Sequence, residues 1–75
     1  MIEDLQERIE SAIPEAVVEV SGEGNRFEIR VVAQAFEGLS RVKRQQAVYA
    51  AIGDLISSGA VHAVTIRALT PAEAG

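Results

Sequence analysis

The stretch "AVVEVSGEGNRFEIRVVA", Ala16–Ala33, decides the fold of this chain. Its first part, Ala16–Ser21, is rich in valine, and β-branched side chains favour strands. Gly22–Asn25 predicts a turn, because glycine and asparagine tolerate positive φ angles. Beyond the turn, Arg26–Ala33 alternates as a strand with one buried face does, and that face carries Phe27, Ile29 and Val31. The stretch therefore predicts an antiparallel β-hairpin.

Amphipathic helices are predicted on both sides of the hairpin. Before it, apolar residues recur at helical spacing up to Pro14, which ends the helix: Ile2, Leu5, Ile9 and Ile13. After it, Ser40 is a good N-cap for a helix over Arg41–Ser58, and Gly59 ends that helix. Its apolar face is expected at Val42, Val48, Tyr49, Ile52, Leu55 and Ile56.

Val61–Leu69 predicts the third strand, and Pro71 is expected to close an ordered core over about residues 2–70, leaving a short C-terminal tail. The order is α-β-β-α-β, and its crossover helix implies that the second and third strands are parallel. Polar residues share one face of each strand, Glu28 with Arg30 and Thr65 with Arg67, so both helices should cover the other face. The 75 residues therefore predict one α+β domain, a KH-like (class II) sandwich with a three-stranded mixed sheet.

The composition argues against several kinds of function. Cysteine is absent, so the chain has no thiolate to serve as a nucleophile or a metal ligand. No apolar run approaches the roughly 18 residues of a membrane span, and the acidic N-terminus does not resemble a signal peptide. No spacing pairs a nucleophile with a base. We expect a cytoplasmic protein that is not an enzyme and does not bind a membrane.

The net charge of −4 is unevenly distributed. From Arg26 to Arg44 the net charge is +3, so the rest of the chain carries −7. Arg41, Lys43 and Arg44 surround the first turn of the second predicted helix, where positive charge opposes the helix dipole. These residues fit a nucleic-acid contact, an ordinary solvated helix start, or a docking face for a protein partner. The sequence pI of about 4.8 argues against a dedicated DNA-binding protein, so the docking face is favoured.

His62 is the single histidine, expected at the start of the third strand in phase with Val64 and Ile66. One interpretation is a half-buried side chain at the edge of the core. The other is a metal ligand, a role for which imidazole is the commonest side chain. One imidazole does not make a metal site, so a partner would have to supply the remaining ligands, thiolates among them.

Several short motifs occur together in a distinctive order, and each is weak alone. They are a Gly-x-Gly hairpin turn with Phe27, "FEG" (Phe36–Gly38), "VKRQQAVY" (Val42–Tyr49), "HA" (His62–Ala63) and "TPAE" (Thr70–Glu73). In this order and spacing, over about Val18–Glu73, the chain resembles the BolA family, and within it the short IbaG-like type.

The resemblance implies an α-β-β-α-β KH-like fold and a partner rather than an enzyme. Members of the family bind monothiol glutaredoxins that carry a Cys-Gly-Phe-Ser motif, and the pair shares a [2Fe–2S] cluster. The glutaredoxin and glutathione supply thiolates, and the BolA-like chain supplies a histidine that maps onto His62. Roles in iron–sulfur cluster trafficking and in stress responses follow. Longer members are described as DNA-binding regulators that use the region matching Ser40–Tyr49.

One position departs from the family pattern. Where the hairpin turn of the family usually carries a histidine, this chain has Arg26. A guanidinium has no available lone pair at neutral pH and does not ligate a cluster. Arg26 is instead a candidate to pair with a carboxylate of glutathione.

Two hypotheses follow. In the first, the chain is a monomer or weak homodimer that forms a heterodimer with a monothiol glutaredoxin and holds or transfers the shared [2Fe–2S] cluster. His62 is then the ligand, and Arg26, Arg41, Lys43 and Arg44 are docking residues. In the second, the chain is a DNA-binding transcriptional regulator that uses the basic helix start at Ser40–Tyr49.

Overall fold

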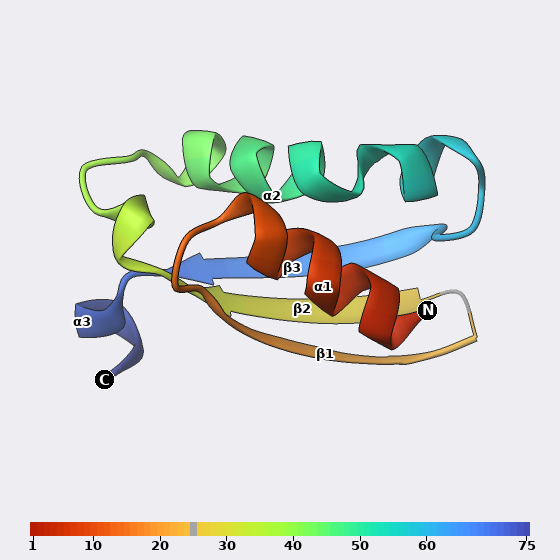
Figure 1. The fold of residues 1–75 in the computed structure, drawn as a ribbon, viewed down its shortest axis with the longest axis horizontal. Helices are drawn as coiled ribbons and strands as arrows, with labels where there is room; N and C mark the ends of the chain where they lie inside the picture. The colour runs from red at the N-terminus through yellow and green to blue at the C-terminus, as the bar shows by residue number, and fades with distance from the viewer. Residues whose placement is uncertain (25) are drawn as a thin grey trace.

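The computed structural model describes residues 1–24 and 26–75. Along the chain lie α1 (Ile2–Ala12), β1 (Val17–Glu23), β2 (Arg26–Val32), the 3₁₀ turn η1 (Gln34–Phe36), α2 (Arg41–Ser57), β3 (Ala63–Leu69) and α3 (Pro71–Ala74). The predicted α-β-β-α-β order and α+β class are confirmed, with η1 and α3 as additions (Figure 1). Among the described residues, no helix is long and apolar enough to cross a membrane.

The three strands form one mixed sheet in the order β1-β2-β3. β1 pairs with β2 antiparallel, with Val20 opposite Ile29, and β2 pairs with β3 parallel, with Ile29 opposite Ile66. Residues opposite one another point to the same face, so Val20, Ile29 and Ile66 lie together. The helix α2 makes the crossover between the two parallel strands, as the sequence predicts.

Both long helices cover one face of the sheet (Figure 1). The core between them is fully apolar, and α1 contributes Leu5 and Ile9, which are completely buried. η1 adds the buried Phe36 from the end of the sheet. The opposite face of the sheet carries polar side chains, and Arg30 lies 3.8 Å from Glu19 there. One apolar and one polar face are what the alternation in Arg26–Ala33 predicts.

The hairpin is tighter than the sequence suggests. The strand pairing continues to Glu23 opposite Arg26, so Gly22 belongs to β1 and not to the turn. A Cβ atom at Gly22 would clash with the backbone carbonyl oxygen of Arg26 and lie 2.7 Å from Cδ1 of Phe27, which explains the need for glycine there. Gly24 has a φ of 60°, as a tight turn requires. Asn25, also predicted in the turn, lies outside the described residues.

The apolar face predicted for α2 is wrong at two positions. Val48 and Ile52 are completely buried, but Val42 is 64% exposed and Tyr49 is 38% exposed. The reason is that Arg44 and Gln45 occupy the side of the first turns that faces β3, where both donate to its carbonyl groups. Val42 and Tyr49, seven residues apart, therefore share a solvent-facing line on the helix.

The predicted C-terminal tail is also wrong, because Pro71–Ala74 form the helix α3. Thr70 and Glu73 make a reciprocal capping box: the Thr70 hydroxyl accepts from the Glu73 backbone, and the Glu73 carboxylate accepts from the Thr70 backbone. Proline stands at the first helical position, where its missing N–H costs nothing. The sequence "TPAE" contained this start signal.

Candidate functional site

His62 lies in the connection between α2 and β3, just before the strand begins. The connection is held firmly on the side that precedes His62. Gly59, with a φ of 83°, reverses the chain after α2, and the backbone N–H of Val61 donates to the carbonyl of Leu55. The Val61 side chain is only 1% exposed and anchors the connection in the core. The backbone that carries His62 is therefore held in place by the core.

The half-buried interpretation of His62 is wrong, since the residue is exposed. β3 begins at Ala63, one residue after His62, and Ala63 pairs with Arg26 of β2. The register thus brings His62 to the same end of the sheet as Arg26, which is also exposed. The structure therefore brings together two of the predicted site residues, which are 36 positions apart in sequence.

The described residues at this end of the sheet offer a single ligand for a metal cluster, the imidazole of His62. His62 is accessible, and imidazole nitrogen is a good ligand to iron. Among residues 1–24 and 26–75, no three histidine, cysteine, aspartate or glutamate side chains gather as a metal site would require. A [2Fe–2S] cluster at His62 would therefore need its other ligands from outside this chain.

Arg41, Lys43 and Arg44 lie at the opposite end of the sheet, at the start of α2. Ser40 caps this helix, and its hydroxyl accepts from the backbone N–H of Lys43 at 3.3 Å, as the sequence predicts. Arg41 and Lys43 are exposed, and neither takes part in an ion pair among the described residues. No acidic residue occupies the first turn, so the positive end of the helix dipole adds to their charge.

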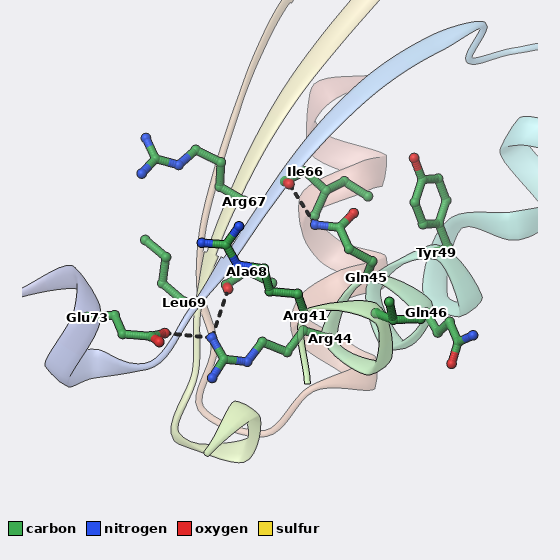
Figure 2. Close-up of a pocket in the computed structure, with 11 residues that line it drawn as sticks. Arg41, Arg44, Gln45, Gln46, Tyr49, Ile66, Arg67, Ala68, Leu69 and Glu73 are labelled. Atoms are coloured by element: carbon green, nitrogen blue, oxygen red, sulfur yellow. Dashed lines mark hydrogen bonds and ion pairs between the residues drawn. The ribbon is translucent and has the colours of Figure 1, made fainter. Parts of the chain in front are cut away.

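Arg44 is placed differently from its two neighbours, with a side chain only 13% exposed. Its guanidinium donates to the carbonyl of Leu39. It also donates to the carbonyl of Ala68 and lies 2.6 Å from a carboxylate oxygen of Glu73 (Figure 2). The hydrogen bond from the Thr70 backbone and then the Arg44 guanidinium hold the pKa of Glu73 below its ordinary value of 4.5. The positive charge of Arg44 thus joins α2, β3 and α3 within the molecule.

The predicted site residues therefore form two groups, not one. β3 has seven residues, and at about 3.3 Å per residue roughly 20 Å of strand separates the two ends. A small partner would contact one group at a time, while a larger partner could reach both.

One residue of the basic end was not assigned a role from the sequence. Arg67 lies on β3 and lines a groove beside Arg41, although the two are 26 positions apart in sequence. The sequence placed Arg67 on the polar face of the sheet, but the proximity of β3 to the start of α2 follows only from the packing.

A family model described as "BolA-like protein" matches residues 5–73 of the chain. An uncharacterized protein from the rpoN-murA intergenic region of Acinetobacter guillouiae is 52% identical over 95% of this chain and 86% of its own length. The acid stress protein IbaG of Escherichia coli K12 is 41% identical over 93% of this chain and 83% of its own length.

Solved structures of related proteins have the same fold. A BolA protein homologue from Coxiella burnetii superposes with a TM-score of 0.84 at 32% identity, over 99% of this chain and 95% of that one. The BolA domain of SufE1 from Arabidopsis thaliana also gives a TM-score of 0.84, at 33% identity over 95% of this chain and 92% of that one.

Proposed function

The chain belongs to the BolA-like family, and on that premise we propose that it is the non-enzymatic partner of a monothiol glutaredoxin. In the heterodimer, His62 provides one ligand to a shared [2Fe–2S] cluster, and the glutaredoxin cysteine and glutathione provide thiolates. The complex holds the cluster or transfers it to a recipient, in the cytoplasm and as part of a stress response. The name of the Escherichia coli relative, an acid stress protein, is consistent with that role.

The observation that carries this proposal is the placement of His62. An exposed imidazole at the end of a strand, on a connection anchored by the buried Val61, is accessible to a partner and costs little to order on binding. The chain lacks cysteine, so thiolates must come from the partner. This division of ligands is what the proposed heterodimer requires.

Arg26 has a supporting role in the proposal. It is exposed, it lies at the His62 end of the sheet, and it is in no ion pair among the described residues. A guanidinium binds carboxylates in a bidentate manner, and glutathione carries two of them. Arg26 would then orient glutathione beside the cluster while His62 ligates iron.

The test is anaerobic mixing of the chain with a cluster-loaded monothiol glutaredoxin, followed by visible circular dichroism and native mass spectrometry. We expect a heterodimer that retains two iron atoms and a spectrum that differs from that of the glutaredoxin alone. His62→Ala should abolish the new spectrum. His62→Cys should restore cluster binding, because cysteine is also a ligand to iron, but the spectrum of that complex should be shifted from that of the wild type. An unchanged spectrum with His62→Ala would rule out His62 as the ligand.

The DNA-binding alternative stays second. Arg44, one of three basic residues at the start of α2, is engaged inside the molecule, which leaves Arg41 and Lys43 there for phosphates. The net charge of −4 also repels a duplex. A titration with duplex DNA at low and high salt tests this function, because phosphate contacts release counterions and make binding steeply salt-dependent. No association at low salt would remove the alternative.

A further inference from the structure

An open groove runs between the first half of α2 and the second half of β3 (Figure 2). We call it the α2–β3 groove. Val42 and Tyr49 line it from the helix, and Ile66 and Leu69 line it from the strand. Its volume of about 610 Å³ is in the range of ligand-binding grooves. It lies at the opposite end of β3 from His62, so its use does not depend on the cluster.

The helix side of the α2–β3 groove carries two exposed apolar side chains among polar ones. Val42 and Tyr49 are two of only five large hydrophobic residues that are exposed among the described residues. They are seven positions apart, which is two helical turns, so both point along the same line of α2. They form a short apolar stripe beside the groove, on which the apolar side chains of a partner can pack.

The charged residues of the α2–β3 groove favour an acidic occupant. Arg41 and Arg67 both line it, and neither is in an ion pair within residues 1–24 and 26–75. The single carboxylate that lines it, on Glu73, is already paired with Arg44. The N-terminal end of α2 adds its positive dipole. Acidic groups of an occupant would therefore meet positive potential without competition.

The edge of β3 indicates the secondary structure of the occupant. The carbonyl of Ile66 accepts from Nε2 of Gln45 at 2.8 Å, and that of Ala68 accepts from the Arg44 guanidinium at 3.4 Å. These carbonyls point away from the sheet, because that of Leu69, the next residue, accepts from Ala33 on the other side. An extended peptide added to this edge would find the acceptors occupied. Each N–H group it left unpaired would cost about 1–3 kcal/mol, whereas a helix satisfies its own backbone.

We propose that the α2–β3 groove binds an acidic amphipathic helix of a partner protein. The lining runs from Arg41 to Tyr49, which spans about 13 Å of α2 and matches two to three turns of a bound helix. The apolar stripe of the occupant packs on Val42 and Tyr49, and its flanking carboxylates pair with Arg41 and Arg67. This is the helix-in-groove mode of peptide recognition.

A second copy of the chain does not supply this helix. The chain has an acidic amphipathic helix of its own, α1, but the apolar side of α1 is used inside the molecule. Leu5 and Ile9 are completely buried against the sheet. Nucleic acid is also a poor match, because the α2–β3 groove offers one aromatic ring, Tyr49, and binding of single strands relies on several stacking rings.

The test uses a fluorescent peptide of about four helical turns, with leucines at i, i+4 and i+7 and glutamates on both sides of that stripe. Fluorescence anisotropy at about 50 mM salt should show saturable binding. Val42→Asp should weaken it by about tenfold or more, as loss of a central apolar contact does. Val17→Asp is the matched control, because Val17 is similarly exposed, at 59%, but lies on β1 away from the groove. It should leave binding unchanged.

A second pair of variants tests the role of charge. Arg41→Glu and Lys43→Glu make the same charge change in the same turn of α2, but only Arg41 lines the α2–β3 groove. We expect the larger loss for Arg41→Glu. Thermal unfolding of each variant verifies that it is folded.

Several outcomes would overturn the proposal. Equal binding of a peptide with proline at its centre would show an extended occupant, and equal binding of a peptide with scrambled leucines would show charge attraction alone. Tighter, Val42-dependent binding of a single-stranded oligonucleotide with the same net charge would show a nucleic-acid surface. No binding of the peptide at about 1 mM would remove the helix from consideration.

Discussion

At the hairpin end of the sheet Arg26 is exposed, whereas at the other end Arg44 is largely buried between α2, β3 and α3. Both are basic residues of one short positive segment of the chain. One is available to a partner, and the other holds secondary-structure elements together. The comparison teaches that a cluster of charge in a sequence does not define one surface, because packing decides whether each charge faces solvent or the molecule itself.

A large loss of stability should come from removing the partly buried Arg44. Arg44→Ala removes the donor to the carbonyls of Leu39 and Ala68 and breaks the ion pair with Glu73, whose carboxylate keeps its hydrogen bond from the Thr70 backbone. We expect a loss of about 2 kcal/mol in the free energy of unfolding. Arg26→Ala should change that free energy by less than about 0.5 kcal/mol, as is usual at exposed sites. Urea denaturation measures both. Equal effects of the two substitutions would show that Arg44 contributes no more to the stability of the fold than Arg26 does.

At the hairpin end, position 22 accommodates only glycine without a steric clash. We expect Gly22→Ala to lower the free energy of unfolding by about 1–3 kcal/mol, because the added Cβ would clash with the backbone carbonyl oxygen of Arg26 and lie 2.7 Å from Cδ1 of Phe27. Gly24→Ala is the control: its Cβ meets nothing within 4 Å, and only the positive φ of 60° opposes it, at about 1 kcal/mol. If Gly24→Ala were the more damaging of the two in urea denaturation, close packing of Gly22 against Arg26 and Phe27 would not be the constraint.

The Arg44 end should also respond to pH through Glu73. The pKa of Glu73 is lowered in the folded state, so its carboxylate stabilises the fold above the unfolded pKa, and this contribution is lost as pH falls through the folded value. Glu73→Gln should therefore be less stable than the wild type at neutral pH, and the two should converge as the pH drops below 4.5. Thermal unfolding across pH shows the convergence, and a constant difference would contradict it.

The smallest effect on stability is expected at His62. Its side chain is exposed, and the Val61 side chain beside it holds the connection in the core. His62→Ala should change the free energy of unfolding, measured by urea denaturation, by no more than about 0.5 kcal/mol. Val61→Ala, one residue earlier, removes buried methyl groups and should cost about 1–3 kcal/mol. A large loss with His62→Ala would mean that the histidine has a structural role.

Much of the fold follows from local patterns. The alternation in β2, the helical spacing before Pro14 and the N-cap at Ser40 each predict an element that the structure contains. The sequence identified His62 as a candidate ligand beside the basic candidates, but it did not show that the His62 side chain is exposed. The sequence also did not show that Arg44 is partly buried and engaged inside the molecule, because this depends on Ala68 and Glu73, which are 24 and 29 positions away.

The sequence by itself determined the order of the elements, the apolar and polar faces of the sheet and the family of the chain, because periodicity, capping and short motifs act within a few residues of each other. Only the tertiary structure decided which side of α2 faces β3, how the basic residues divide between two ends of the sheet, and that Val42, Tyr49, Arg41 and Arg67 line one groove. These features arise when a crossover helix packs against the following strand and brings together residues more than twenty positions apart, and the register of that packing is set by the whole core.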